Sequence, residues 1–188
     1  MRPYLRVANV YEDRLDLSDV KAMNFSPEEF ETYALRFGDI LLNEGQSPEL
    51  VGRPAMYRDE IPGCCYQKTL LRFRAREGVS QRWALLVFRS HLHSGRFRRS
   101  ASITTSIAHL AAERFVRIEF PLPPYHEQDA IVETVEDQLS VIDHLERDLD
   151  ARQKSDQALR QSILRHAFTG QLVPQDPTDA PASELLKR

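Results

Sequence analysis

The spacing of apolar positions divides this chain into two parts. Over about the first 120 residues the pattern changes every ten or so positions, as expected for short strands and helices packed into one domain. From Tyr125 to Phe168 there is no glycine or proline, and apolar residues recur at heptad spacing. We therefore predict an α+β fold with a globular domain at 1–122, one long coiled-coil helix at 123–170 and a short C-terminal tail at 171–188.

Capping residues and alternation predict individual elements within the domain. Ser26-Pro27 with a glutamate three residues after the serine is typical of a helix start, and Ser80 can cap a second helix. The continuous apolar run Ile40–Leu42 predicts a buried strand. The remaining expectations are strands at 4–10, 68–76 and 115–120, a helix at 103–110, and an abrupt stop at the prolines of 121–124.

A long polar segment follows the predicted buried strand. Residues 43–54 are punctuated by Gly45 and Gly52, and the segment is long for a simple connection. Connecting segments often carry binding residues on a rigid scaffold. We therefore predict that this polar loop, residues 43–54, has a function.

The long helix carries an apolar stripe that needs a partner. With Val135 at heptad position a, the stripe is broken in its middle by Arg152 and Asp156, which restrict register at a cost in stability. About 43 residues make a helix of about 65 Å, roughly twice the diameter of a domain of this size. We expect a homodimer through this helix, in which the two helices could pair in either parallel or antiparallel orientation. The predicted seam consists of Ile131, Val135, Ile142, Leu145, Leu149, Leu159 and Ile163.

Charge is distributed unevenly along the chain. The formal net charge is −3, yet residues 66–100 hold nine Lys and Arg against a single acid, Glu77. Residues 121–188 hold seven basic and thirteen acidic residues. A solvated basic face is one interpretation of the block, but repulsion on this scale is best relieved by phosphate, and we favour double-stranded DNA as the partner.

Side chains that donate and accept in one plane, such as Asn and Gln, and the guanidinium fork of Arg can pair bidentately with purine edges in the major groove. A strand at 68–76 would also display Arg72, Arg74 and Arg76 on one face. From the polar loop and the basic block, the predicted DNA contacts are Asn43, Gln46, Ser47, Arg53, Lys68, Arg72, Arg74, Arg96, Arg98 and Arg99.

Signals for other classes of protein are weak. Leu122-Pro123-Pro124-Tyr125 has the shape of an adenine methyltransferase motif, but leucine replaces the residue that must accept the amino group. No glycine-rich nucleotide loop follows a strand, and the six histidines are too scattered for a metal set. Neither a secretory signal nor a membrane span is present, and Cys64 and Cys65 are neighbours expected to stay reduced. We expect a cytoplasmic protein with no catalytic residues, metal or cofactor.

Several segments together resemble the specificity subunit of type I restriction-modification systems. None is diagnostic alone, but their order and spacing are specific, and they cover nearly the whole chain. The segments are Gly38–Asn43, Ser47–Arg53, Pro121–Pro124 with Glu127-Gln128 and Ile131-Val132, Arg160–Leu164, Ala167–Pro174 and Ala182–Leu186.

The resemblance implies a non-catalytic subunit that selects the DNA sequence and holds its partner subunits. Modification subunits would supply S-adenosylmethionine-dependent adenine methylation, and restriction subunits would supply ATP-driven translocation and cleavage. Members of the family carry two recognition domains and two spacer helices, whereas this chain has one of each. It would therefore read half a target, either as a half-subunit that dimerises or as the second half of a longer protein. The acidic outer face of the helix and the tail would dock the modification subunit.

Two alternatives stay open. The chain could be a structural coiled-coil homodimer whose basic patch is incidental, or an orphan fragment of a DNA methyltransferase. Salt-dependent binding of duplex DNA separates the first alternative from recognition, and methyl transfer by the chain alone would support the second.

Overall fold

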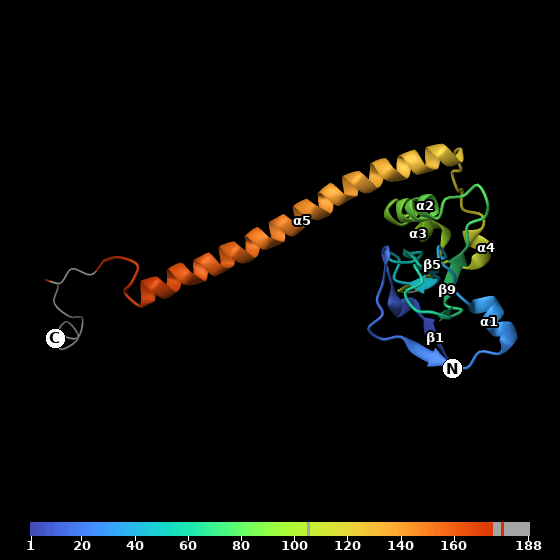
Figure 1. Cartoon of the computed structure of the whole chain (residues 1–188), viewed down its shortest axis with the longest axis horizontal. Coiled ribbons are helices and arrows are strands. Elements are labelled where there is room, and N and C mark those ends of the chain that lie inside the picture. The colour runs from blue at the N-terminus through green and yellow to red at the C-terminus, as the bar shows by residue number, and fades with distance from the viewer. Residues whose placement is uncertain (105, 175–177, 179–188) are drawn as a thin grey trace. The chain divides into compact units, whose positions relative to one another are not determined.

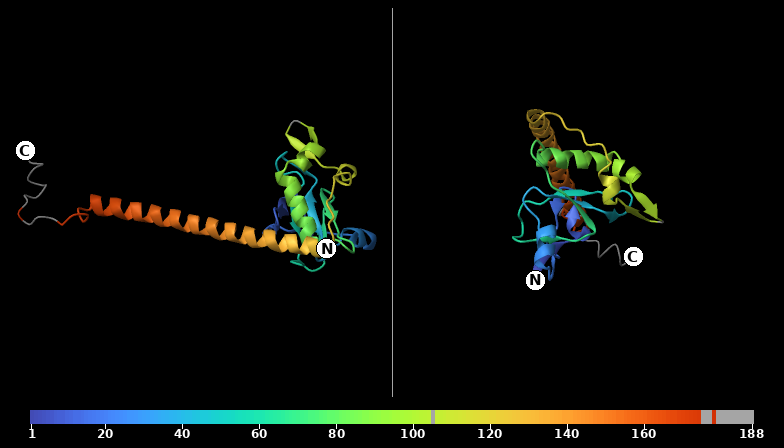
Figure 2. Two further views of the ribbon diagram at one scale, coloured as in Figure 1. Left: turned by 90° about the horizontal axis from the view of Figure 1, so that it is seen from above. Right: turned by 90° about the vertical axis from the view of Figure 1, so that its right-hand side faces the viewer.

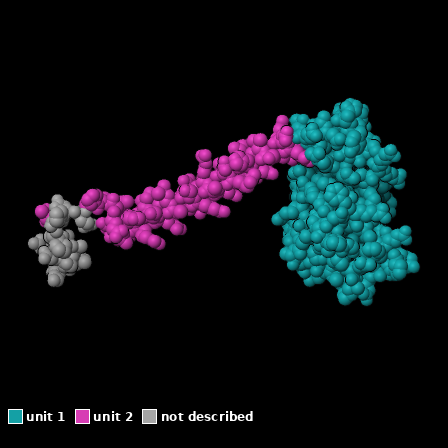
Figure 3. Space-filling model, in the orientation of Figure 1, with its two compact units in different colours: residues 1–134 teal, residues 135–188 magenta. Residues whose placement is uncertain are grey.

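The computed structural model describes residues 1–104, 106–174 and 178, and it divides into two units, residues 1–134 and 135–188 (Figure 3). The first unit is a mixed α+β domain of small sheets, and helix α5, Tyr125–Phe168, follows it (Figure 1). This confirms the predicted fold class. The compact unit continues to Thr134, past the boundary predicted at residue 122, because the first turns of α5 pack into it.

The strands of the first unit form four small sheets. Among the described strands only the pair β1–β8 is parallel, and the other pairings are antiparallel. The sheets are β4 (Lys21–Met23), β1 (Arg2–Leu5) and β8 (Cys65–Tyr66); β7 (Pro54–Met56), β5 (Ile40–Asn43) and β9 (Leu70–Phe73); β2 (Val10–Tyr11) and β3 (Arg14–Leu15); and β10 (Ser102–Thr104), β11 (Ile107–His109) and β6 (Gly45–Gln46).

Strand β5 lies at the centre of the core, as its apolar run predicted. Ile40 and Leu42 pack into one cluster with Phe88 and Phe97, whereas Leu41 packs on the opposite face into a second cluster. All three of these β5 side chains are completely buried. A strand that is covered on both faces is apolar throughout instead of alternating, which explains the continuous run.

Besides η1 (Val7–Asn9) and the first turns of α5, four short α-helices lie among the described residues of the first unit. They are α1 (Pro27–Tyr33), α2 (Gln81–His93), α3 (Arg96–Ser100) and α4 (Ala112–Phe115). The predicted starts at Ser26 and Ser80 are confirmed: Ser26 and Glu29 form a reciprocal capping box, and the Ser80 hydroxyl accepts the Trp83 N–H at 3.5 Å. At the start of β8, Cys64 and Cys65 are free and buried, and burial raises the pKa of Cys64 to about 12.

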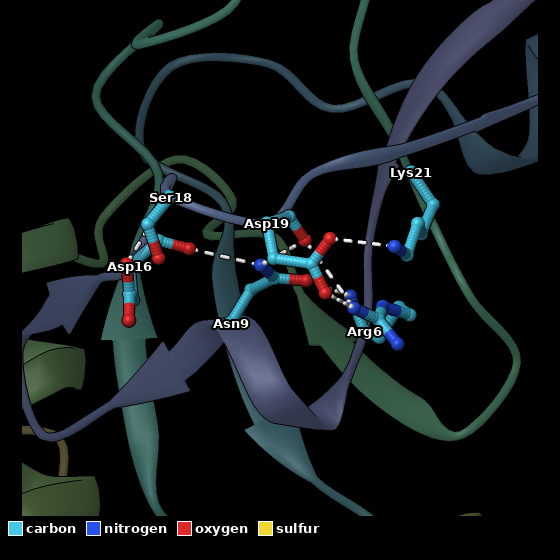
Figure 4. A network of polar contacts seen from close by, with 6 residues as sticks. All are labelled: Arg6, Asn9, Asp16, Ser18, Asp19 and Lys21. Carbon is cyan, nitrogen blue, oxygen red and sulfur yellow. Dashed lines mark hydrogen bonds and ion pairs between the residues drawn. The ribbon is translucent and has the colours of Figure 1, made fainter.

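The strand predicted at 4–10 is wrong beyond Leu5. A 3-10 helix, η1 (Val7–Asn9), interrupts it because the buried Asn9 side chain binds the backbone around it. Asn9 Oδ1 accepts the Arg6 N–H at 3.0 Å, and Nδ2 donates to the Asp16 and Asp19 carbonyls at 2.9 and 3.2 Å (Figure 4). Asparagine often replaces ladder hydrogen bonds in this way, which the alternating pattern did not reveal.

Two further expectations are wrong. The segment predicted as a helix at 103–110 contains the hairpin β10–β11, in which Ala108 and Leu110 are buried while Ile107 and His109 are exposed. This period of two is the strand pattern, and pairing with β6 selects it over the helical spacing of the apolar residues. The strand predicted at 115–120 is also absent, since Phe115 ends α4 and the following residues are irregular.

The first turns of α5 are anchored in the first unit. The buried Gln128 side chain accepts the Ser80 N–H at 2.9 Å and donates to the Gly78 and Pro123 carbonyls at 3.0 and 2.8 Å. Val132 is buried in a small cluster with Trp83, and Ile131 is partly buried there. The placement of Ile131 in the coiled-coil seam is therefore wrong, because it packs within the domain.

The rest of α5 belongs to the second unit. The helix ends as predicted, with Gly170 at φ +69° and the Gln171 N–H bound to the His166 carbonyl at 2.8 Å. Beyond residue 140 every helical side chain is exposed, including the predicted seam residues Ile142, Leu145, Leu149, Leu159 and Ile163. Most of the predicted tail, 171–188, lies outside the described residues. Among the described residues, no helix has the length and hydropathy to cross a membrane.

Candidate nucleic-acid interface

The polar loop 43–54 has a defined conformation that internal hydrogen bonds and packing against α3 maintain. After β6, the Ser47 carbonyl accepts the N–H groups of Leu50 and Val51, both at 3.0 Å, and Val51 is buried. Gly52 has φ +76° and lies against the Phe97 ring, where a Cβ atom would come within 2.4 Å. Glycine is required there both for the left-handed conformation and for the close approach of α3. The loop is therefore held in one shape against α3.

The hairpin β10–β11 shares a sheet with this loop. Ala108 pairs with Gln46, and His109 pairs with Gly45. The hairpin protrudes from the first unit at a different edge from α1 (Figure 2). Its side chains Ile103 and Ile107 are about half exposed. Ile103 is opposite Ala108 and Ile107 is opposite Thr104, so the two isoleucines lie on opposite faces of the hairpin.

Helix α3 places three predicted arginines beside the loop and the hairpin. Arg98 lies 3.9 Å from the Glu49 carboxylate of the loop, and Arg96 pairs with Glu119 at 2.9 Å. Arg99 donates to the Ser94 carbonyl at 2.9 Å. We call the polar loop, α3 and the hairpin together the loop–hairpin surface. It brings together five of the predicted DNA contacts: Gln46, Ser47, Arg96, Arg98 and Arg99.

Asn43 does not belong to this surface. Its side chain is fully buried at the end of β5, with Nδ2 3.5 Å from the Val10 carbonyl and Oδ1 buried without a partner among the described residues. Its backbone carbonyl accepts the Gly52 N–H at 2.8 Å, which closes the loop. Asn43 therefore shapes the loop and does not reach a base in this structure, contrary to our expectation.

Arg53, near the end of the loop, packs against Tyr11. Its guanidinium lies 4.6 Å from the centre of the Tyr11 ring, and its Nε is buried without a hydrogen bond in the described part of the chain. Burial lowers the pKa of Arg53, and the nearby Tyr11 and Glu12 oppose this shift. Stacking on Tyr11 is a structural role that differs from the predicted base contact.

The arginines of β9 and the residue after it hold the end of α1. Arg72 donates to the Thr32 carbonyl at 3.0 Å, and Arg74 binds the buried Asp39 carboxylate through two bonds of 2.6 and 2.7 Å. The hydrogen bonds that Arg74 donates to the Asp39 carboxylate raise the pKa of Arg74. The two arginines therefore satisfy backbone carbonyls at the end of α1 and neutralise the buried Asp39 carboxylate, which also accepts the Arg36 N–H at 2.9 Å. Strand β9 ends at Phe73, so only Arg72 of the predicted arginine row lies on it, and Arg72 and Arg74 bind protein groups in this structure.

The remaining members of the basic block are also divided. Lys68 is exposed, with its ammonium 5.8 Å from the centre of the Tyr33 ring. Arg89 and His93 both bind Glu12, at 2.9 and 2.8 Å. Burial raises the pKa of Glu12, but the hydrogen bonds from His93 and Arg89 outweigh burial and hold this pKa below its ordinary value. The block predicted from sequence thus separates into a structural part and the part on α3.

Sequence reasoning also missed two features of this region. The exposed isoleucines of the hairpin were assigned to a helix, and Arg117, which lies near Arg96 and Arg99, falls outside the block 66–100. Only the density of arginines between 96 and 117 could have indicated the second feature. In the described part of the chain, no group of three or more His, Cys, Asp or Glu residues could hold a metal ion.

The chain is similar in sequence to several type I restriction enzyme specificity subunits. No protein-family model matches the chain. The chain is 28% identical over 176 residues to the type I restriction enzyme StySPI specificity subunit of Salmonella potsdam, covering 91% of this chain and 37% of that protein. It is 25% identical to the EcoKI specificity subunit of Escherichia coli K12, covering 92% and 38%.

The chain is thus similar over most of its length to type I restriction specificity subunits. It spans about two fifths of the length of these relatives, which corresponds to one half of such a subunit. The crystal structure of the HsdS subunit from Thermoanaerobacter tengcongensis has the same fold, with a TM-score of 0.67 at 20% identity over 96% of this chain and 45% of that one. A chain from a type I R-M system structure matches with the same TM-score over 91% and 39%.

Proposed function

We propose that this specificity-subunit chain recognises one half of a split DNA target and has no catalytic activity of its own. Methylation and cleavage would come from modification and restriction subunits that the chain holds together, in the cytoplasm. Two observations support this function. The chain is similar to specificity subunits over about nine tenths of its own length and about two fifths of theirs. It also contains one globular unit and one long helix.

The loop–hairpin surface is the observation that carries the DNA-binding part of the proposal. A two-stranded ribbon fits the major groove of B-DNA, and the hairpin β10–β11 is such a ribbon at a protruding edge. Gln46 lies on the strand that pairs with it. Arg96, Arg98 and Arg99 flank the ribbon from α3, where they would meet phosphates. Lys68, at the start of β9, is a further exposed cation.

Titration of duplex DNA at several salt concentrations tests this function. For the chain with its modification subunit, the logarithm of the binding constant should fall linearly with the logarithm of the salt concentration. The slope should be about one unit for each phosphate that is contacted. Binding without a salt slope would contradict the proposal. The same protein incubated alone with S-adenosylmethionine and DNA should transfer no methyl group.

The exposed part of α5 supports a proposal about assembly. Ile142, Leu149 and Ile163 are each about half exposed or more, although they occupy a positions of the heptad. A second copy of α5 would cover this seam, now without Ile131, and would join two recognition domains. The acidic outer face of α5 would then be left for the modification subunit.

One observation favours the alternative of a structural homodimer with an incidental basic patch. Arg72, Arg74 and Arg89 all bind protein groups, so fewer cations of the block are available for DNA than the sequence indicates. The salt titration separates the two functions, because the structural alternative predicts no salt-dependent DNA binding by the folded dimer.

A further inference from the structure

An arginine-lined cleft of about 370 Å³ opens beside α3. It lies between α3 and the irregular segment that follows α4. Its lining residues are Arg96, Arg99, Ser100, Arg117, Ile118 and Glu119.

Positive charge dominates this cleft. Three guanidinium groups line it together with one carboxylate, that of Glu119, which is 81% exposed and binds Arg96 at 2.9 Å. Arg117 is exposed, and no hydrogen bond or ion pair of its side chain is seen in the described part of the chain. Nearby, Arg114 donates to the Ser100 carbonyl at 3.4 Å, which adds a fourth positive charge at the edge.

The chemistry of the cleft fits a phosphate group. Guanidinium groups bind phosphate oxygens through paired N–H donors, and the Ser100 hydroxyl offers one more donor. The like charges of Arg96, Arg99 and Arg117 would repel one another less with a dianion or monoanion between them. The cleft is open and polar, so a phosphate that remains attached to a polymer backbone can enter it.

Its place in the fold favours a phosphate of DNA over a free anion. Ser100 lines the cleft, and β10 begins two residues later at Ser102. The cleft is therefore joined to the protruding hairpin by a short, directly connected segment. Phosphate contacts fix the position of a protein on the duplex, whereas base contacts specify sequence.

We propose that Arg99 and Arg117, with Arg96, bind one backbone phosphate of the DNA and so set the register at which the hairpin β10–β11 meets the base edges. This inference rests on the proposed function and deepens it, because it assigns a positioning site that is separate from the residues that read the sequence. Arg96 would exchange its exposed contact with Glu119 for the phosphate.

Single substitutions of the full chain, with its modification subunit present, test the site. Arg99→Ala and Arg117→Ala should each weaken DNA binding about five- to tenfold on every duplex, and each should lower the salt slope by about one. Arg117→Lys keeps the charge and should restore most of the slope. Arg36→Ala removes one exposed arginine elsewhere on the same unit and should leave the slope nearly unchanged.

A phosphate-by-phosphate experiment then locates the contact. Neutral methylphosphonates are placed one at a time in a duplex recovered from a random pool by the chain. One position should weaken binding by the unsubstituted chain about tenfold, and the Arg99→Ala, Arg117→Ala double variant should be insensitive to that same position. Additive losses from the variant and from every methylphosphonate would contradict a direct contact.

The outcomes distinguish failure of this site from failure of the proposed function. Salt-dependent DNA binding with no effect of either arginine substitution would refute the cleft and leave DNA recognition standing. Binding without any salt slope would refute both. Weaker binding of the modification subunit with unchanged binding of DNA would show that the cleft docks acidic protein, and would also overturn the proposal.

Discussion

Arg74 and Arg98 belong to one basic block of the sequence, yet the fold gives them different tasks. Arg74 binds Asp39, whose side chain is 1% exposed, whereas Arg98 is exposed and lies 3.9 Å from an exposed glutamate. A buried carboxylate needs a partner, while an exposed cation at the loop–hairpin surface can exchange its weak contact for a phosphate. An arginine paired with a buried carboxylate is therefore unavailable to DNA, whereas one near an exposed carboxylate remains available.

Arg74→Ala should destabilise the domain much more than Arg98→Ala. Loss of Arg74 leaves the buried Asp39 carboxylate without its cationic partner, although the Arg36 N–H still donates to it at 2.9 Å. This loss should lower the free energy of unfolding by about 2 kcal/mol once the partial exposure of Arg74 is taken into account. Arg98→Ala should change it by less than about 0.5 kcal/mol. Urea denaturation of both variants measures the difference. Equal effects would mean that the Arg74–Asp39 pair does not stabilise the fold.

Gln46→Ala should change sequence preference without unfolding the protein. Loss of a bidentate amide contact should cost about 1–3 kcal/mol at one base pair and little elsewhere. The duplexes that the variant selects from a random pool, compared with those of the unsubstituted chain, measure this. Asn43→Ala is the contrast. Because the Asn43 side chain is buried, this substitution should lower the free energy of unfolding, while the protein that stays folded should select the same sequences as the unsubstituted chain. A changed preference for Asn43→Ala alone would reverse these roles.

Glu12 gives the domain a pH dependence of defined sign. Its carboxylate accepts bonds from Arg89 and His93, and its pKa is lower in the folded state than ordinary. The stabilisation is therefore present above the unfolded-state pKa and is lost as the pH falls through the folded-state pKa. The difference in free energy of unfolding between the native chain and Glu12→Gln should shrink as the solution is acidified through that range. A difference independent of pH would show that Glu12 contributes no charged interaction.

At the scale of elements, the sequence predicted best those that are determined locally. The capping box at Ser26, the buried run of β5 and the proline-free span of α5 all depend on neighbours in sequence, and all three are confirmed. The hairpin β10–β11 was missed because β6, from a distant segment, selects its strand conformation. The break after Leu5 was missed because it depends on Asn9 binding residues of a later loop.

The candidate site was predictable only in part for the same reason. The local excess of arginine and lysine located the basic block, and the positions of glycine located the loop. Neither feature could show which arginines bind carbonyl or carboxylate groups of the protein itself. Arg72 satisfies carbonyls at the end of α1, and this contact joins residues about forty positions apart. Such partners are defined by the fold, so the division of the block between structure and binding appears only in three dimensions.

The seam of α5 gives the element-scale prediction. Ile142→Asp with Leu149→Asp should convert a dimer to monomers, because charged side chains at successive a positions cannot be buried against a second helix. Light scattering measures the mass. Leu164→Asp is the matched control: Leu164 is as exposed as its neighbour Ile163 but lies off the seam, so its variant should remain dimeric. A monomeric unsubstituted chain, or an unchanged mass for the double variant, would contradict pairing through this seam.

At the scale of the whole molecule, the decisive feature is the number of recognition units. The chain has one domain and one long helix, and it covers about two fifths of relatives that are called specificity subunits. Two copies joined through α5 would be related by a two-fold axis, and such a pair presents the same surface to both half-sites in opposite orientations. The spacing between half-sites would then be fixed by the helices.

Selection of duplexes from a random pool by the chain with its modification subunit tests the central claim most directly. The account predicts one short sequence that is recovered as two inverted copies at a constant separation, and a single copy when Ile142→Asp and Leu149→Asp prevent pairing. Recovery of no common sequence under low-salt conditions that permit binding would contradict half-target recognition by this chain.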